Sequence, residues 1–410
     1  MRICILQDIL PLHFEGGAQF LGWRTATALA GRGHDVTVVT SQCKDYPRST
    51  MVEGTRLHCL DSVSIGVTGF YGLFAREALD RVVREQQNDF DVVQIRGWRT
   101  AALAGQICRQ VPLDIPLLGH TSGLGFCYEF ETRPRVLWQE TDGTQAGKLK
   151  RVLTRRFYYL RDIFPMERAV RYLNGFSTVT TRGLCLAHRL YGIPRSKLHL
   201  INDGIPSGRF SPPRDEPDGH RLLYVGALVK RKGVDVLIHA LQHILRALPD
   251  VRLRIVGDGP EMQSLRDLSV RIGVHRAVEF AGVLANEKIP AELQSCNVFV
   301  NPSISTVGYE TVQIEAMLCG RIVVAPDTSS NRMILIHRRT GLLFRQGNTR
   351  SLAKTLVKAF RFDTATLERI GAEARRNALE NFSVERMAEM NEQVFKNVIS
   401  EFRQGAACDV

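Results

Sequence analysis

The feature that most constrains this sequence is an alternation of short apolar runs with longer amphipathic stretches, which occurs in two successive series. The first series starts with an apolar run at 2–6, passes through a turn with Gly16 and Gly17 and a helical stretch, and reaches the run DVTVVT. Short apolar runs separated by helix-length stretches predict parallel strands joined by helices. The first series therefore predicts a doubly wound α/β domain, with further strands at 91–95, 115–121 and 176–181 and helices at 72–87 and 100–110.

The alternation starts afresh at 221 and predicts a second, complete α/β domain. Its predicted strands are RLLYVGALV, VRLRIVGDGP, VEFAGVL, NVFVNPS and RIVVAP, and a helix is predicted between each pair. Between the two series, residues 206–220 contain four prolines, a composition typical of an interdomain linker. We predict an N-terminal domain at 1–205, a linker at 206–220, a second domain at 221–382, and a helix at 383–410 that packs back on the first domain.

Composition excludes several classes of protein. The 410 residues suffice for two cores, and a hydrophobic share of 44% is typical of a globular chain. Nine cysteines without a Cys-x-x-Cys pair favour a reduced intracellular protein over a disulfide framework or a zinc site. The first residues resemble a strand rather than a signal peptide, and no run approaches the ~18 apolar residues of a spanning helix. We expect a cytoplasmic monomer or homodimer.

The loop VGALVKRKGVDVLI joins a predicted strand to a predicted helix. Gly226 permits a tight turn, the cations Lys230, Arg231 and Lys232 follow, and Gly233 opens the helix. Cations together with the amides of a helix start form an anion site suited to a diphosphate. The alternative is a solvated basic turn, and this loop alone leaves both interpretations open.

Two further turns follow predicted strands. Gly257-Asp-Gly-Pro260 places Pro260 at the first turn of a helix, where proline is common. In NPSISTVGYETVQIEAMLCG, Glu310 falls at the predicted start of a helix and Glu315 one to two turns in. A carboxylate there can simply complement the helix dipole, or it can bind both hydroxyls of a nucleotide ribose.

Taken together, these segments resemble the family 4 glycosyltransferases, which have the GT-B fold of two Rossmann-like domains facing across a cleft. The resemblance runs in order over nearly the whole chain. It is carried by Gly16-Gly17, the strand ending at His120, Asn202-Asp-Gly204 before Phe210 and Pro212, Gly226 with Lys232-Gly233, Gly257-Asp-Gly-Pro260, Gly282, Pro302-Ser303, Glu315-Ala-Met and Cys319-Gly320.

The resemblance implies a donor site in the second domain. Lys232, with the neighbouring Arg231, is expected to contact the donor diphosphate, and Glu315 is expected to hold the nucleotide ribose. Backbone groups near Gly282 and Val283 are expected to meet the base. The expected co-substrate is a GDP- or UDP-linked sugar.

The resemblance also implies contributions from the first domain. Gly16 and Gly17 are expected to let a loop approach the donor phosphate, because a residue without Cβ allows close contact. His120 matches the histidine that contacts the transferred sugar near its reacting carbon. A lone histidine is equally well explained as a structural residue, so its place in the motif series is what favours this role.

The sequence departs from the family pattern around the expected sugar site. The usual Glu-x7-Glu motif would place its first acid at Val307, and the usual second loop glycine is replaced by Glu310. We interpret Glu310 as having taken over sugar recognition, with Gly308 and Tyr309 beside it. The alternative is an impaired donor site in a non-catalytic relative.

Family members transfer a sugar with retention at the anomeric carbon and without a metal. The leaving diphosphate gains negative charge, which Lys232, a neighbouring cation and helix amides can stabilise. We therefore predict no cofactor and no bound metal, with His120, Lys232 and Glu310 as the catalytic residues.

The acceptor is expected to be a small molecule or a lipid, in natural-product or glycoconjugate biosynthesis. Residues 147–173 carry eight Lys and Arg against two acids, with aromatic residues interleaved. Such a segment can rest on anionic lipid at the inner membrane face or bind an anionic acceptor, although a solvated helix is the commoner outcome. Frequent Arg and Ala are typical of high-GC bacteria.

Other functional classes fit less well. A dehydrogenase would need Gly-x-Gly-x-x-Gly in the first turn, which ILQDILPLHFEGGA lacks. Nucleic-acid binding is not expected, because basic charge without an aromatic platform or a recognition helix is weak evidence. The alternatives that remain are a non-catalytic nucleotide-sugar-binding homologue and a non-hydrolysing nucleotide-sugar epimerase, which shares the fold.

Overall fold

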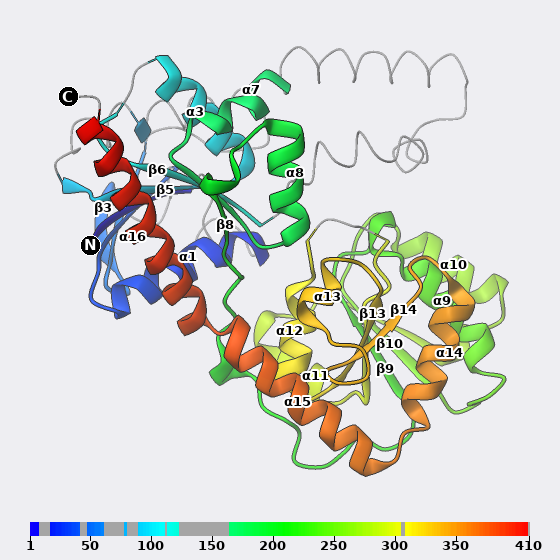
Figure 1. Ribbon diagram of the computed structural model, residues 1–410. Helices are drawn as coiled ribbons and strands as arrows, with labels where there is room; N and C mark the ends of the chain where they lie inside the picture. Colours follow the sequence, from blue (N-terminus) through cyan, green and yellow to red (C-terminus); the bar gives the residue numbers. More distant parts are fainter. Residues whose placement is uncertain are drawn as a thin grey trace, which may run out of the picture. The chain divides into compact units, whose positions relative to one another are not determined.

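The computed structural model divides into two compact units. One comprises Met1–Gly204 and Val384–Val410, and the other comprises Ile205–Ser383 (Figure 1). The last helix therefore belongs to the first unit. The residues that the structure describes are 1–7, 17–41, 47–60, 78–79, 89–110, 113–122, 164–304 and 308–408.

The first unit is built on one sheet, whose described strands lie in the order β3-β4-β2-β1-β5-β6-β7-β8. Neighbouring strands are parallel except for β3 and β4, which form a hairpin that the sequence did not predict. The described strands are β1 (Arg2–Gln7), β2 (Asp35–Thr40), β3 (Ser49–Val52), β4 (Thr55–Cys59), β5 (Val92–Arg96), β6 (Leu117–Thr121), β7 (Gly175–Thr178) and β8 (Leu198–Leu200). The α-helices with described bounds are α1 (Gly17–Gly31), α3 (Trp98–Gln110), α7 (Phe164–Ala169), α8 (Thr181–Tyr191) and α16 (Val384–Cys408).

Alternate residues of β1 show how this sheet is buried on both faces. Ile3 and Ile5 pack in a cluster with residues of α1 and α16, including Phe395. Cys4 and Leu6 pack in a second cluster with residues of α3 and α8. Parallel strands covered on both faces have near-continuous apolar sequences, which is why the sequence RICIL predicted a strand correctly.

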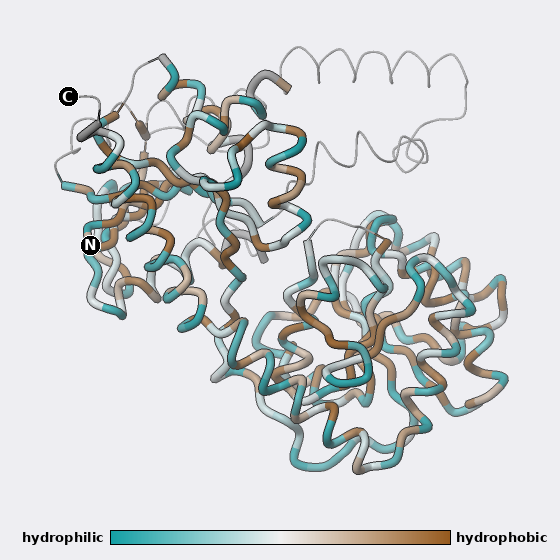
Figure 2. Tube along the Cα trace, viewed as in Figure 1, coloured by the Kyte–Doolittle hydropathy of each residue, from teal (hydrophilic) through white to brown (hydrophobic). Residues whose placement is uncertain are grey.

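The second unit contains a described sheet in the order β11-β10-β9-β12-β13-β14, with every neighbouring pair parallel. Hydrophobic segments occupy the interior of each unit (Figure 2). The strands are β9 (Arg221–Val225), β10 (Arg252–Val256), β11 (Val278–Gly282), β12 (Val298–Val300), β13 (Ile322–Pro326) and β14 (Leu342–Phe344). The α-helices are α9 (Val234–Ile244), α10 (Met262–Arg271), α11 (Ile289–Gln294), α12 (Thr311–Leu318), α13 (Asn331–Ile334), α14 (Thr349–Phe360) and α15 (Thr364–Phe382).

The proline-rich segment 206–220 lies within the second unit. Phe210 is buried in an apolar cluster of that unit, and Glu216 accepts two hydrogen bonds of 2.9 Å from the buried Arg321. The amide of Asn297 donates to the carbonyl of Pro217 at 2.9 Å. One aromatic anchor and these polar contacts hold the segment against the unit, whereas its composition alone predicted a linker.

Each sheet contains a point at which the strand order reverses. In the first unit, β1 lies between β2 and β5, and in the second, β9 lies between β10 and β12. The loops that leave the two central neighbours at such a point diverge, and open α/β sheets bind ligands outside the carboxyl ends of those strands.

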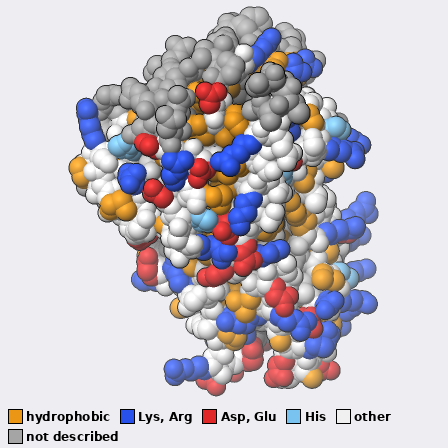
Figure 3. Space-filling view, turned by 60° about the vertical axis from the view of Figure 1, so that its left-hand side comes forward, with side chains coloured by type: hydrophobic (Ala, Val, Ile, Leu, Met, Phe, Trp, Pro, Cys, Tyr) orange, Lys and Arg blue, Asp and Glu red, His pale blue; other side chains and the backbone are white. Residues whose placement is uncertain are grey.

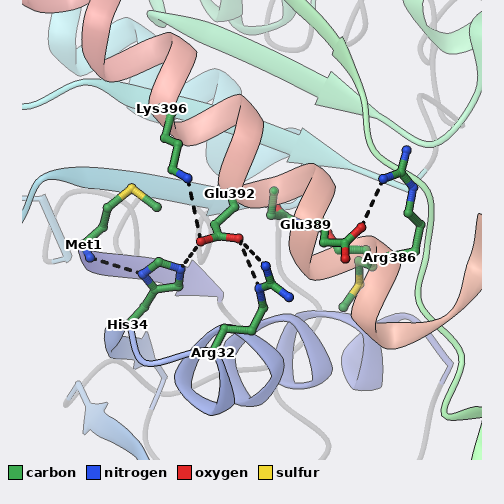
Figure 4. Close-up of polar contacts among 9 residues, drawn as sticks. Met1, Arg32, His34, Arg386, Glu389, Glu392 and Lys396 are labelled. Carbon is green, nitrogen blue, oxygen red and sulfur yellow. Dashed lines mark hydrogen bonds and ion pairs between the residues drawn. The ribbon is translucent and has the colours of Figure 1, made fainter.

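Helix α16 is joined to the start of the chain by a cluster of polar contacts (Figure 4). Glu392 accepts from Arg32 at 2.7 and 3.1 Å and is paired with His34 Nε2 at 2.9 Å. The other ring nitrogen of His34 lies 3.2 Å from the amino group of Met1. These contacts connect the last helix to α1 and β1 within the first unit.

The surface shown in Figure 3 carries Lys and Arg side chains interspersed with Asp and Glu side chains. Among the described residues, no helix combines the length and the apolar composition that crossing a bilayer requires.

Candidate active site

The loops that follow β9 and β12 lie against each other at the reversal point of the second sheet. The amide of Ile304 and the hydroxyl of Ser303 both donate to the carbonyl of Arg231, at 3.0 and 3.1 Å. Gly233 has a φ of 65°, and a Cβ there would lie 2.3 Å from the carbonyl oxygen of Pro302. Both the backbone conformation and the contact therefore require glycine.

The loop after β10 is joined to the same region. The amide of Leu228 donates to the carbonyl of Asp258 at 2.8 Å, and the amide of Glu261 donates to the carbonyl of Leu228 at 3.0 Å. A Cβ on Gly257 would lie 2.0 Å from the carbonyl oxygen of Gly226. The glycine turns after β9 and β10 thus permit two backbones to touch.

Lys232 and Glu310, which are 78 residues apart, form an ion pair at this edge of the sheet. The ammonium of Lys232 donates to the Glu310 carboxylate, and the two side chains are 13% and 28% exposed. Lys232 ends a short 3-10 turn, and Glu310 is the N-cap residue of α12. The structure therefore brings together the predicted diphosphate ligand and the predicted sugar ligand.

A chain of buried amides fixes the start of α12 and was missed by the sequence analysis. Gln313 accepts from the Asn301 side chain at 2.8 Å and from the Glu310 backbone amide at 3.2 Å. Its own amide donates to Asn331 at 3.2 Å, which donates to the Pro326 carbonyl at 2.9 Å. The available signal was an asparagine directly after β12 and another shortly after β13, because polar residues that follow buried strands lie at the ligand-binding edge.

The remaining predicted residues of this loop and helix are placed as follows. Glu315 lies half-buried on α12, and Gly308 has a φ of 74° just before the helix. The ring of Tyr309 packs edge-on against that of Phe382, with centroids 6.0 Å apart. This contact gives Tyr309 a packing role at the end of α15.

The predicted base-binding residues end β11. The carbonyl of Gly282 accepts from the amide of Gly257 at 2.8 Å, which joins this strand end to the loop after β10. Val283 is 74% exposed. An exposed apolar side chain at the carboxyl edge offers a surface for one face of a planar base.

Some predictions fall outside the described residues. Gly16, Val307 and residues 147–163 are among these, and Gly17 is the first residue of α1.

In the first unit, His120 belongs to a row of polar residues near the carboxyl ends of adjacent strands. The register pairs each of these residues with the next on the neighbouring strand. In order they are Gln7 on β1, Arg96 on β5, His120 on β6, Ser177 on β7 and His199 on β8. His120 is 2% exposed, and its Nδ1 lies 2.9 Å from the Ser177 hydroxyl. Burial and the charge of Arg96 lower the pKa of His120 well below its ordinary value, so the imidazole is neutral.

Arg96 and Asp203 are buried charged residues with exposures of 6% and 5%. The sequence analysis assigned neither of them a role, although Asp203 belongs to the motif Asn202-Asp-Gly204. Burial lowers the pKa of Arg96 to about 10 and raises that of Asp203 to about 6, while their mutual attraction opposes both shifts. The Ser122 hydroxyl donates to Asp203 at 3.5 Å. The sequence signal that could have identified Arg96 is its position as a charged residue at the end of the apolar run VVQIR.

Arg96 is also linked to the last helix. It donates to the Thr25 hydroxyl at 3.2 Å and to Gln94 at 3.4 Å, and the Gln94 amide donates to Asn391 of α16 at 2.9 Å. Gln94 and Asn391 are fully buried. The position of α16 is therefore coupled to the polar row around His120.

The sequence contains one Asp-x-Asp segment, Asp89-Phe-Asp91, immediately before β5. Asp91 accepts from the amide and the guanidinium of Arg2, at 2.8 and 3.0 Å. This pair lies at the amino ends of β1 and β5, away from the edge that carries His120. Within the described ranges, no group of His, Cys, Asp and Glu side chains is arranged to hold a metal ion.

Comparison with known proteins adds independent evidence on the family. Residues 219–361 match the family model for glycosyl transferases group 1, and residues 15–209 match that for glycosyltransferase family 4. The chain is 29% identical over 205 residues to the GDP-mannose-dependent alpha-(1-6)-phosphatidylinositol monomannoside mannosyltransferase of Mycolicibacterium smegmatis, covering 46% of this chain and 53% of that one. An uncharacterised glycosyltransferase of Methanocaldococcus jannaschii is 22% identical over 415 residues, covering 97% and 98% of the two chains.

Solved structures resemble the whole chain in fold. The sucrose-phosphate synthase of Thermosynechococcus elongatus has a TM-score of 0.74 at 19% identity, covering 98% of this chain and 99% of that chain. Anabaena HepE in complex with UDP has a TM-score of 0.70 at 16% identity, covering 97% and 100%. The two units are thus the two Rossmann-like halves of a GT-B fold, and the chain belongs to glycosyltransferase family 4.

Proposed function

We propose that this protein is a retaining glycosyltransferase that moves a sugar from a nucleotide diphosphate donor to a small-molecule or lipid acceptor without a metal ion. The observation that carries the proposal is the position of Lys232. It lies at the reversal point of the second sheet, on a basic loop before a helix, and is paired with an acid from the adjoining loop. Family membership supports the same reaction class.

In this proposal the second unit holds the nucleotide. Lys232 and Arg231 bind the diphosphate together with the free amides at the start of α9. Glu315 binds the ribose, and the base lies against Gly282 and Val283. The high exposure of Val283 supports this last assignment.

The chemical step breaks the bond between the anomeric carbon and the diphosphate oxygen, and the acceptor oxygen bonds to the same face of that carbon. Negative charge gathers on the leaving diphosphate, where the Lys232 ammonium and the helix amides stabilise it. The leaving phosphate oxygen takes the acceptor's proton, so the reaction needs no strong protein base. His120 is neutral and is not needed as a base in this mechanism. Its proposed role is to form a hydrogen bond with the transferred sugar.

Glu310 links donor binding to sugar recognition. Its carboxylate is paired with Lys232. When the diphosphate takes over Lys232, the carboxylate becomes available for hydroxyl groups of the donor sugar, beside Gly308 and Tyr309. This exchange gives Glu310 a place in the site despite its displacement from the usual family position.

The donor is proposed to be GDP- or UDP-linked. The mycobacterial relative is named for GDP-mannose, and the Anabaena structure contains UDP. The first unit is proposed to select the acceptor, in natural-product or glycoconjugate biosynthesis. The expected contact of residues 147–173 with an anionic membrane stays a prediction.

A ligand screen tests the proposal directly. Purified protein is heated with GDP, UDP, ADP or dTDP, and the best nucleotide then selects the donor sugars to incubate with acceptor mixtures for mass spectrometry. We expect one nucleotide to raise the melting temperature and a glycosylated product to form. No stabilisation by any nucleotide contradicts the donor site, binding without transfer indicates a non-catalytic relative, and donor conversion without acceptor indicates an epimerase.

Lys232→Ala tests the diphosphate assignment. Removal of the Lys232 ammonium is expected to weaken nucleotide binding by about tenfold to a hundredfold, since hydrogen bonds to charged groups contribute ~1.5–3 kcal/mol. Calorimetric titration with the nucleotide from the screen measures the change. Lys358→Ala, on the exposed end of α14, is the matched control and should bind like the parent.

A further inference from the structure

The Ser177 hydroxyl makes two hydrogen bonds that constrain its neighbour His120. Ser177 Oγ lies 2.9 Å from His120 Nδ1 and 3.2 Å from the carbonyl oxygen of Gly119. Ser177 itself is fully buried. A hydroxyl has one proton, and a carbonyl oxygen can only accept, so the contact with Gly119 requires that proton.

This assignment decides which ring nitrogen of His120 carries a hydrogen. With its proton directed to Gly119, the Ser177 oxygen can only accept from His120, so Nδ1 must be protonated. The second nitrogen, Nε2, then has a lone pair. It is buried, and among the described residues it has no hydrogen-bond partner.

The opposite tautomer would cost more. If Nε2 carried the hydrogen, Ser177 would have to donate to Nδ1 and would give up its bond to Gly119. A buried N–H would also remain without an acceptor, and orphaned buried N–H groups are rarer in proteins than under-satisfied acceptors. Leaving a buried donor or acceptor without a partner carries the desolvation penalty of that group, so this tautomer is disfavoured.

We propose that Ser177 is a positioning residue that holds His120 in its Nδ1-protonated form, so that Nε2 accepts a hydrogen bond from a hydroxyl group of the transferred sugar. The sugar contact rests on the proposed function, whereas the tautomer rests on the geometry of the first unit alone. The unpartnered Nε2 is then an acceptor whose missing donor belongs to the substrate.

The charged groups around this histidine support a neutral ring. Arg96 is the register neighbour of His120 on β5, Ser177 is the register neighbour on β7, and Asp203 is buried with Arg96. Burial and the positive charge of Arg96 both disfavour the imidazolium. A neutral imidazole can accept at Nε2 throughout the working range of pH.

Nitrogen-15 NMR of the ligand-free protein tests the tautomer without any substrate. Long-range proton–nitrogen correlation distinguishes the two neutral forms, and loss of one ring signal in His120→Gln assigns the residue. We expect His120 to show protonated Nδ1 at pH 6 to 8, and Ser177→Ala to change this pattern. A wild-type ring protonated at Nε2, or a pattern unchanged in Ser177→Ala, would overturn the proposal.

Kinetics then test the positioning role. Ser177→Ala should lower kcat/KM for the donor sugar by at least about tenfold and leave free-nucleotide affinity unchanged, because the nucleotide contacts lie in the other unit. Ser177→Thr, which keeps the hydroxyl, should recover most of the loss, and Ser269→Ala is a buried-serine control on α10. Equal kcat/KM in Ser177→Ala and the control would contradict the role.

A pair of histidine variants gives a second check that does not require a stable Ser177 variant. Glutamine can place a carbonyl oxygen near the position of Nε2, whereas asparagine can replace only Nδ1. His120→Gln should therefore keep more transfer activity than His120→Asn, and the reverse order would overturn the acceptor role of Nε2. If no donor supports transfer, the proposed function fails while the NMR result still decides the tautomer.

Discussion

At the scale of single residues, the first unit carries an unusual cost in Arg96 and Asp203. Both are almost fully buried, and burying charge is unfavourable even when the charges attract each other. The pKa of Asp203 is raised to about 6 because burial outweighs the attraction of Arg96. Arg96 belongs to the polar row that contains His120, and Asp203 is the buried charge that attracts Arg96.

The raised pKa of Asp203 predicts a specific dependence of stability on pH. Between pH 4 and 6 the unfolded chain has lost this proton while the folded chain keeps it, so raising the pH favours unfolding. Relative to Asp203→Asn, the parent should therefore lose about 2 kcal/mol of unfolding free energy between pH 4 and 7. Urea unfolding followed by tryptophan fluorescence measures it, because all three tryptophans precede residue 205.

The exposed Asp35→Asn is the control for that experiment, and it should follow the parent at every pH. If the difference between parent and Asp203→Asn were constant from pH 4 to 7, Asp203 would be ionised in the folded state throughout.

Glu310→Gln gives a second prediction for a single residue. Loss of the carboxylate charge frees Lys232, so affinity for free nucleotide should stay the same or rise by up to about fivefold, the value of a partly exposed ion pair. The ranking of donor sugars should change, because the group proposed to bind sugar hydroxyls is altered. Titration with nucleotide measures the affinity, and competition between donor sugars measures their ranking. If Glu310→Gln lost affinity for free nucleotide and for every donor sugar equally, Glu310 would be a structural residue of the loop.

At the scale of elements, helix α16 is attached to the first unit in two chemically different ways. Met387 and Phe395 are buried in the core cluster, and Asn391 hydrogen-bonds to Gln94 inside it. Glu392 is paired at the surface with Arg32 and His34 (Figure 4). The apolar contacts provide most of the stability, while the buried amide pair specifies the register of the helix.

Glu392→Gln is expected to lower the stability of the first unit by about 1 kcal/mol, because two charge-assisted contacts are lost. The hydrogen bonds from Arg32 lower the pKa of Glu392, so this contribution is present at neutral pH and disappears as the pH falls below about 4. Urea unfolding of the parent and Glu392→Gln at pH 7 measures the loss of stability, and the same comparison at pH 3 tests whether the difference disappears. Glu389→Gln, which removes an exposed ion pair with Arg386 on the same helix, should change stability very little.

At the scale of the whole molecule, the chain leaves the first unit after Gly204 and returns to it at Val384. The first unit is therefore discontinuous in sequence, and the second is a single continuous segment. Removal of the last helix should damage the first unit and spare the second.

A chain ending at Ser383 is predicted to lose the cooperative tryptophan transition of the first unit, because the buried face of α16 is gone. Stabilisation of the second unit by nucleotide should persist, since its sheet and loops lie within 205–383. A chain ending at Phe402 keeps the buried residues of α16 and lacks the helix end, where the described residues Arg403, Gln404 and Gly405 are exposed; it is the control. An unchanged tryptophan transition in the shorter chain would show that α16 is dispensable for the core.

The sequence predicted most strands and helices because they depend on local patterns. Apolar runs such as RICIL and LLYV, and glycine turns such as Gly226 and Gly257, were recognisable one segment at a time. It missed the β3–β4 hairpin, because the turn residues Glu53 and Gly54, both with positive φ, lack the usual Asn-Gly or Asp-Gly signal.

By itself, then, the sequence determined two doubly wound units, the family, and the segments that carry Lys232, Glu315 and His120, since periodicity, turn chemistry and motif order are local properties of the chain. Only the tertiary structure decided which of those residues meet. The pairing of Lys232 with Glu310 follows from the neighbouring positions of β9 and β12, and the row from Gln7 to Ser177 follows from strand register. Strand order and register depend on how distant segments pack, and no local pattern specifies them.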